Sequence, residues 1–281
     1  MTMIYDLHTH STASDGTLTP TQLVERATAA GVKVLALTDH DTLDGIPEGM
    51  VEARRQGIRM VPGVEVSVTW GGRVIHVVGL GIDPDCEQLR AGLMSLREFR
   101  SWRAIEIARQ LEKAGIPGAY EGAKALSGGH LIARTHFARF LVGQGIVKEL
   151  KSVFKHYLVR GRPGYVAGNW AELGEAVSWI KQAGGQAVVA HPARYRFTHS
   201  KLQRLLGEFR EAGGEGMEVV SGSHNREDAL AMARHAKQSG LLASAGSDYH
   251  GPDHTWVELG RIPELPSGIA PIWNEWPAFV S

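Results

Sequence analysis

Histidine and acidic side chains recur in short clusters along the chain. His8 and His10 are two residues apart, as are Asp248 and His250, and in extended backbone residues at this spacing point the same way. Each pair could therefore grip one cation, and Glu65 could bridge two with its two carboxylate oxygens. Imidazole and carboxylate groups without thiolates suit Mn²⁺, Fe²⁺ or Zn²⁺. The candidate metal ligands are His8, His10, Asp15, His40, Glu65, His76, His191, Asp248 and His250.

Nine candidate ligands exceed the three or four that one ion needs, and they suffice for two or three ions. A lone histidine on an apolar strand is more often a satisfied core residue. Nine buried polar side chains would all need hydrogen-bond partners, however, so the set is not explained as ordinary core residues. Clustered cations lower the pKa of water to about 7 and neutralise a phosphoryl oxyanion. The nine residues are therefore also the candidate catalytic residues.

The candidate ligands lie at or just beyond the ends of expected strands. Repeated βα units of this length predict a parallel sheet, open or closed. In a closed barrel the carboxyl ends of the strands meet at one rim, where active sites lie. We expect strands at 4–8, 32–38, 59–68, 186–190, 217–220 and 241–244, a hairpin partner at 73–80, and helices at 20–31, 85–113, 201–212 and 225–239.

The alternation of expected strands and helices is interrupted between residues 115 and 167. This stretch is broken by glycines, helical at 133–142 and 148–157, and basic near its end. We therefore predict a first barrel part at 1–114, an inserted helical substrate-binding domain at 115–167 and a second barrel part at 168–281. Thr19 should cap a helix with Pro20 at its first position, and Asn169 should open a capping box after the insertion.

Composition excludes several classes of protein. Lys+Arg and Asp+Glu both number 30, which argues against a protein that coats duplex DNA, because such a protein needs a strongly basic face. Cys86 is the only cysteine, so disulfides and thiolate zinc sites are excluded. No run of 18 apolar residues predicts a membrane span. We expect a cytoplasmic protein with no membrane partner.

Six motifs carry eight of the nine candidate ligands, all except His76. They are Asp6-Leu7-His8-Thr9-His10-Ser11, Ser14-Asp15-Gly16, Thr38-Asp39-His40-Asp41, Pro62-Gly63-Val64-Glu65, Ala190-His191-Pro192 and Gly246-Ser247-Asp248-Tyr249-His250. In type and order they resemble the motifs of the PHP (polymerase and histidinol phosphatase) family. The resemblance covers nearly the whole chain outside 115–167.

This resemblance implies an α/β fold, a distorted (β/α)₇ TIM-like barrel with a three-metal centre, and phosphoester hydrolysis. Mn²⁺ is the expected metal, with Fe²⁺ or Zn²⁺ as alternatives. The implied ligand sets are His8, His10, Glu65 and Asp248 for the first ion, Glu65, His76 and His191 for the second, and Asp15, His40 and His250 for the third.

The insertion and its flanks resemble one subgroup of the family, through Arg134-Thr135-His136-Phe137-Ala138-Arg139 and His191-Pro192-Ala193-Arg194-Tyr195. That subgroup includes 3′,5′-nucleotide bisphosphate phosphatases and 5′-3′ exoribonucleases. Arginine is the natural bidentate clamp for phosphate. Arg134, His136 and Arg194 are therefore the candidate substrate-binding residues. The best single substrate is adenosine 3′,5′-bisphosphate, hydrolysed to AMP and phosphate.

Several alternatives stay open from the sequence. The same site could cut a short 5′-phosphorylated oligonucleotide, with the 5′-phosphate as anchor. Histidinol phosphate phosphatase is a further possibility, although it explains neither the insertion nor the arginines. An amidohydrolase would share a metal-rimmed barrel but often bridges two metals with a modified lysine, where this chain has Glu65. A noncatalytic module would be expected to have lost ligands.

Overall fold

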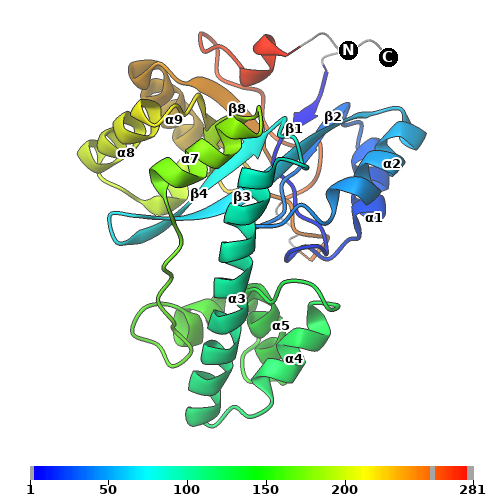
Figure 1. Cartoon of the computed structure of the whole chain (residues 1–281), viewed down its shortest axis with the longest axis vertical. Coiled ribbons are helices and arrows are strands. Elements are labelled where there is room, and N and C mark those ends of the chain that lie inside the picture. The colour runs from blue at the N-terminus through cyan, green and yellow to red at the C-terminus, as the bar shows by residue number, and fades with distance from the viewer. Residues whose placement is uncertain (1–2, 254–256, 277–281) are drawn as a thin grey trace.

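Seven strands of the computed structural model follow one another around a nearly closed, barrel-shaped sheet (Figure 1). The structure describes residues 3–253 and 257–276. In sheet order the strands are β1 (Tyr5–Asp6), β2 (Val34–Leu37), β3 (Arg59–Trp70), β4 (Arg73–Leu80), β6 (Gln186–Val189), β7 (Gly216–Ser221) and β8 (Leu242–Gly246), while the short β5 (Ala171–Glu172) pairs with β3 off this path.

The two ends of the sheet meet beside the N-terminal strand. The Leu7 amide donates to the Ala245 carbonyl at 3.0 Å, and Thr9 forms a parallel bridge with Tyr249. These contacts join the segment after β1 to β8, more than 200 residues away in the sequence. The expected α/β fold with a distorted (β/α)₇ barrel is confirmed.

The sheet is mixed rather than purely parallel. β4 runs antiparallel to both β3 and β6, and the other neighbours along the barrel path are parallel. Gly71 and Gly72 connect β3 to β4 with φ of 53° and 70°, the positive values that a tight hairpin turn requires. The predicted hairpin is therefore present, and it places Glu65 and His76 on adjacent strands.

Side chains of β2 alternate between two apolar layers. Val34 and Ala36 pack with Val78 and Val188 from other strands of the barrel. Leu35 and Leu37 instead join the larger core between the sheet and the outer helices. A strand buried on both faces explains why this segment is continuously apolar in sequence.

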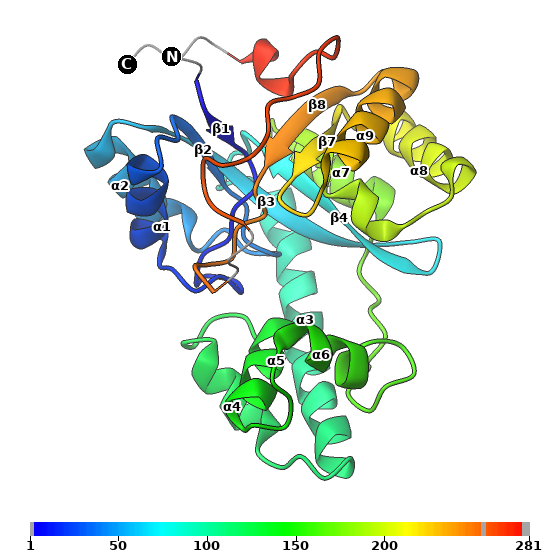
Figure 2. The same cartoon turned by 180° about the vertical axis from the view of Figure 1, so that it is seen from behind.

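Helices cover the outside of the barrel: α1 (Pro20–Ala29), α2 (Ile46–Gln56), α7 (Leu173–Gln182), α8 (His199–Glu211) and α9 (Arg226–Ser239) (Figures 1 and 2). The Thr19 side chain caps α1 in a capping box with Gln22, as predicted. The predicted box at Asn169 is wrong. α7 begins at Leu173 with Glu172 as its N-cap, because residues 171–172 are already paired with β3.

A helical unit lies beneath the barrel and consists of α3 (Glu87–Lys113), α4 (Ala119–Leu126), α5 (Arg134–Gly143), α6 (Leu150–Val153) and a π-helical turn (Phe154–Leu158). α3 is 27 residues long, about 40 Å, and Figure 2 shows it running from the barrel into this unit. Leu111, Phe137 and Leu141 form part of a separate, fully buried core. Among the described residues, no helix has the length and apolarity needed to cross a membrane.

Candidate metal centre

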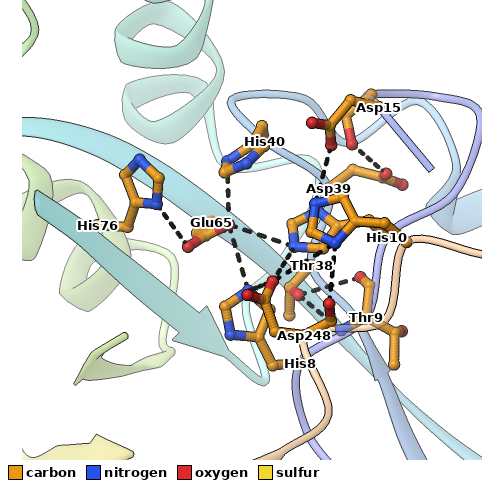
Figure 3. Close-up of polar contacts among 12 residues, drawn as sticks. His8, Thr9, His10, Asp15, Thr38, Asp39, His40, Glu65, His76 and Asp248 are labelled. Atoms are coloured by element: carbon orange, nitrogen blue, oxygen red, sulfur yellow. Dashed lines mark hydrogen bonds and ion pairs between the residues drawn. The ribbon is translucent and has the colours of Figure 1, made fainter. Parts of the chain in front are cut away.

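Glu65 is the hub of the candidate ligands. Its Oε1 lies 2.8 Å from His76 Nδ1 and 3.0 Å from His191 Nε2. Its Oε2 lies 2.9 Å from His40 Nδ1 and 3.2 Å from His8 Nε2, and 3.3 Å from His10 Nε2. Figure 3 shows His8, His40 and His76 converging on this carboxylate, the first two from the segments after β1 and β2 and the third from β4. The barrel thus brings five imidazoles onto one buried acid.

The remaining three predicted ligands complete the cluster. Asp248 Oδ1 lies 3.3 Å from His10 Nε2 and 3.6 Å from His8 Nε2. His250 Nε2 lies 3.2 Å from Asp15 Oδ1. All nine residues predicted from the sequence therefore meet in one place.

Three groups within this cluster have ligand atoms that all lie within 4.8 Å of one another. They are His8, His10, Glu65 and Asp248; His10, Asp15, His40 and His250; and His40, Glu65 and His76. The first group matches the set that the family resemblance implies for one ion. His10, His40 and Glu65 each belong to two groups, and His191 reaches the cluster through Glu65. Several buried sets of donors indicate a centre for more than one metal ion.

The pairing argument for Asp248 and His250 does not hold. Asp248 has φ of 56°, so the backbone there is left-handed rather than extended. The two side chains lie 3.6 Å apart but fall in different groups. Asp41 and His191 also have positive φ, at 52° and 30°. Such conformations cost non-glycine residues about 1–3 kcal/mol each and cluster at functional sites. The strained positions follow β2, β6 and β8, where the candidate ligands lie.

Glu218 in β7 is a component that the sequence reasoning missed. Its Oε1 accepts a hydrogen bond from His8 Nδ1 at 2.5 Å, and its Oε2 accepts from the His191 backbone amide at 2.6 Å. This contact fixes the His8 tautomer and turns Nε2 toward Glu65, an arrangement common around metal-binding histidines. An acid within the apolar strand Gly216–Ser221 was the available signal.

Asp39 holds the loop that carries Asp15. Its Oδ1 accepts from the Ser11 amide at 2.8 Å and from Ser14 Oγ at 2.6 Å, and its Oδ2 accepts from Ser11 Oγ at 2.7 Å. A Cβ at Gly16 would lie 2.4 Å from the His10 carbonyl oxygen, so the loop folds tightly against the strand end. The serines and the glycine of these motifs therefore shape the backbone around the ligands.

Electrostatics within the cluster favour charged carboxylates. Burial by itself would raise the pKa of Glu65, but His40, His76 and His8 outweigh it and hold that pKa well below its usual range. Burial likewise opposes ionisation of Asp248, but His8 and Arg194 lower its pKa. Burial would lower the pKa of His8, and Glu218 and Glu65 raise it instead.

Many buried polar atoms of the cluster make no hydrogen bond. They are His8 Nε2, His10 Nδ1 and Nε2, Asp15 Oδ1, His40 Nδ1, Glu65 Oε2 and His191 Nδ1. Buried polar groups in proteins are nearly always hydrogen-bonded, so a concentration of exceptions needs a cause. Nitrogen and oxygen donors directed at one another are what divalent cations would satisfy, and the donor set fits Mn²⁺, Fe²⁺ or Zn²⁺.

A cavity of about 170 Å³ opens beside the cluster, between the barrel rim and the helical unit. Candidate ligands line its barrel side, and Arg100, Arg103, Arg134 and Arg194 line it as well. The cavity also includes Phe154 and Trp170. Arg100 and Arg103, both on α3, were not anticipated from the sequence.

The three predicted substrate-binding residues have different surroundings. Arg134 lines the cavity, with its guanidinium 5.6 Å from the centre of the Phe154 ring. Arg194 also lines it, and its Nη1 donates to Asp248 Oδ2 at 2.5 Å. His136 is buried outside the cavity lining, where its Nδ1 accepts from the Ala133 amide at 2.9 Å. Their roles in binding substrate stay predictions.

The helical unit contacts the cluster of candidate ligands directly. Thr135 Oγ1 donates to Asp15 Oδ2 at 3.0 Å, and Arg139 Nη2 donates to the Asp15 carbonyl at 3.0 Å. The N-terminal end of α5 therefore lies against a candidate ligand. This contact makes the helical unit part of the site and fixes one wall of the cavity.

Comparison with known proteins agrees with this geometry. The PHP domain family matches residues 6–185. A Chromobacterium violaceum 3′,5′-nucleoside bisphosphate phosphatase is 49% identical, over 96% of this chain and 95% of that protein. A Haemophilus influenzae 5′-3′ exoribonuclease is 46% identical, over 98% of this chain and 100% of that protein.

A solved structure is also similar over nearly the whole chain. It is described as an amidohydrolase from Chromobacterium violaceum with bound sulfate and no metal, and it matches with a TM-score of 0.93 at 49% identity. The alignment covers 96% of this chain and 95% of that one. With the family match and these full-length relatives, the chain belongs to the PHP domain family of phosphoesterases.

Proposed function

We propose that this protein hydrolyses a phosphomonoester of a small nucleotide that carries a second phosphate, with adenosine 3′,5′-bisphosphate as the best substrate. The observation that carries the proposal is the cavity, in which four arginines lie next to the buried histidine and carboxylate cluster. One phosphate would react at the cluster and the other would be held by arginine. The Chromobacterium violaceum relative bears the name of this activity.

The nine candidate ligands would hold two or three divalent cations, with Mn²⁺ first among them. When bound, these ions would supply Lewis-acid activation of water and neutralise charge on the phosphoryl oxygens. Glu218 keeps His8 in one tautomer and orientation. Asp39 holds the loop with Asp15. The chain thus presents its donors in fixed positions, so that little reorganisation is needed when the phosphate reacts.

Two other activities are less well supported. Hydrolysis of histidinol phosphate leaves the cavity arginines without a role. Hydrolysis of C–N bonds would fit a site bridged by a modified lysine, whereas Glu65 is the hub here and the described cavity lining contains no lysine.

The test is phosphate release by the Mn²⁺-loaded protein from adenosine 3′,5′-bisphosphate, 3′-AMP, 5′-AMP and histidinol phosphate at matched concentrations. We expect strong preference for the bisphosphate and complete loss of activity on chelation, with recovery after Mn²⁺ is restored. Equal rates on the bisphosphate and 3′-AMP would contradict recognition of a second phosphate.

A 5′-3′ exoribonuclease that acts on short 5′-phosphorylated oligonucleotides is the second candidate. The Haemophilus influenzae relative, 46% identical over its full length, carries that name. The scissile bond would be the same 3′-phosphoester, with the 5′-phosphate as anchor. Comparing a 5′-phosphorylated dinucleotide with a longer oligomer separates the two activities, because a bisphosphate phosphatase should fail on both.

A further inference from the structure

A short basic segment of the helical unit takes no part in the site described above. Of the chain's 30 basic and 30 acidic residues, residues 148–162 hold five and one, which leaves the remainder with a net charge of −4. Positive charge is therefore concentrated in this stretch. The five cations are Lys148, Lys151, Lys155, Arg160 and Arg162.

Packing separates the apolar and the charged side chains of this segment, which comprises α6, the π-helical turn and the loop after it. Val153 and Leu158 are fully buried in the core of the helical unit, and Phe154 packs against that core. The five cations are all exposed, and none of them forms an ion pair with a carboxylate of the described residues. Lys151 and Lys155 are four residues apart and lie on the same face. We call these five side chains the basic surface.

The basic surface adjoins the wall of the cavity. Phe154, which lines the cavity, lies between Lys151 and Lys155 in the chain. Figure 2 shows α6 in the part of the helical unit that is nearest the barrel. None of the five cations lines the cavity itself. A ligand that occupies the cavity can therefore reach them only if it extends outward past Phe154.

Repeated positive charge outside a nucleotide-sized cavity suits a single-stranded nucleic acid. Such a strand carries one phosphate for each nucleotide, and lysines and arginines that neutralise these phosphates release bound counterions. Proteins that hold single strands commonly use a basic surface that follows the backbone. A nucleoside bisphosphate would fill the cavity and leave the basic surface unused, whereas a strand whose first nucleotide lies in the cavity would use both.

We propose that the basic surface binds the downstream nucleotides of a single-stranded RNA whose 5′-terminal nucleotide occupies the cavity. This inference rests on the exoribonuclease activity given above as the second candidate, and it states where the rest of that substrate lies. The five side chains contact backbone phosphates and take no part in cutting the bond. They strengthen the binding of long substrates and leave that of a single nucleotide unchanged.

The test compares the double variant Lys151→Gln/Lys155→Gln with the matched control Lys33→Gln/Lys237→Gln. The control removes the same charge from two exposed lysines outside the basic surface, so any effect of net charge alone is shared. The substrates, with Mn²⁺ present, are adenosine 3′,5′-bisphosphate and a 5′-phosphorylated dinucleotide and octanucleotide of adenylate.

The expected effect depends on substrate length and on salt. Each phosphate contact to a single strand contributes a salt slope of about 0.7, or roughly fivefold in affinity at 0.1 M salt. Two lost contacts should therefore raise KM for the octanucleotide by up to about 25-fold and lower its salt slope by about 1.4. KM for the bisphosphate should stay within about twofold of the wild type, because neither lysine lines the cavity. The control should change neither value.

The outcomes decide the assignment. A KM for the octanucleotide equal to that of the control overturns it, as does an equal rise for all three substrates. Lys151→Arg/Lys155→Arg keeps both charges and should retain the salt slope of the wild type. If the glutamine variant does not fold, Arg160→Gln/Arg162→Gln in the adjoining loop decides the question by the same measurements.

A binding measurement separates this inference from the activity on which it rests. Fluorescence anisotropy of a 3′-labelled, 5′-phosphorylated octanucleotide in EDTA requires no turnover, and its Kd should rise by up to about the same 25-fold in the glutamine variant. If the wild type fails to hydrolyse RNA, the exoribonuclease activity is wrong, yet this rise still supports the surface. An unchanged Kd, or no binding by the wild type, overturns it. Capture on phosphatidylglycerol vesicles without RNA binding overturns it in favour of a membrane surface.

Discussion

Replacing Glu218 with glutamine should weaken metal binding without removing any candidate ligand. Glu218 is 1% exposed and accepts from two donors, His8 Nδ1 at 2.5 Å and the His191 amide at 2.6 Å. Glutamine offers a single carbonyl oxygen, so its NH₂ group must face one of these donors. One charge-assisted hydrogen bond is then lost, and His8 is no longer held in a single tautomer.

The expected loss can be bounded from this geometry. A hydrogen bond to a charged group contributes about 1.5–3 kcal/mol, and partners of metal-binding histidines typically affect metal affinity or activity by about 10- to 100-fold. We therefore expect Mn²⁺ affinity of Glu218→Gln to fall by about 10- to 100-fold. The rate at saturating Mn²⁺ should fall less than the affinity, because all nine candidate ligands remain.

The assay is competition for Mn²⁺ with a chromophoric chelator, together with metal content after dialysis. Glu211→Gln is the matched control, since Glu211 is exposed at the end of α8 and undergoes the same chemical change. Thermal unfolding of the metal-free proteins shows whether the variant is folded. Wild-type Mn²⁺ affinity in a folded Glu218→Gln protein would refute a role for Glu218 in orienting His8.

Three further predictions test other parts of the structure. His191→Ala should lower phosphate release by more than about 100-fold and reduce bound metal, and full activity with full metal content would refute its assignment as a ligand. Gly246→Ala places a Cβ 2.4 Å from the His8 Cβ, so the free energy of unfolding should fall by about 1–3 kcal/mol and the thermal midpoint with it. The control Gly207→Ala, where the added Cβ meets open space on α8, should leave the thermal midpoint unchanged or higher. Burial lowers the pKa of His136 from 6.5 to about 4. Because the unfolded chain binds a proton at this histidine at higher pH than the folded chain, the free energy of unfolding should decrease by up to about 3 kcal/mol as pH falls from 6.5 to 4. The same dependence of the free energy of unfolding on pH in His136→Gln would contradict this origin.

The architecture of the barrel could be predicted because local patterns determine its elements. The continuously apolar segment at 32–38 predicted a strand buried on both faces, and the structure places β2 at Val34–Leu37. Thr19 and Pro20 marked the start of α1 correctly. The predicted capping box at Asn169 was wrong because pairing of residues 171–172 with β3 overrides a local capping signal. α2 was missed because Gly45 supplies no side-chain cap.

The candidate ligands could be named from the sequence because the chemistry of metal binding is a property of residue types. Their positions after strands predicted that they would meet, and all nine do. Which of them share a group was decided only in three dimensions. Asp248 and His250 fall in different groups although their side chains lie 3.6 Å apart, and the left-handed backbone at Asp248 is not revealed by spacing along the chain.

The residues that support the candidate ligands could be identified only from the tertiary structure. Glu218 reaches His8 across 210 residues of sequence, and Arg103 faces the cavity because α3 runs from the barrel into the helical unit. The Nδ1 of His136, a candidate for substrate binding, accepts from the Ala133 amide, a contact that the sequence did not predict. A sequence determines which chemical groups are available and which local elements carry them. Closure of the sheet and packing of the helical unit decide which groups become neighbours, because those contacts depend on the direction of each side chain.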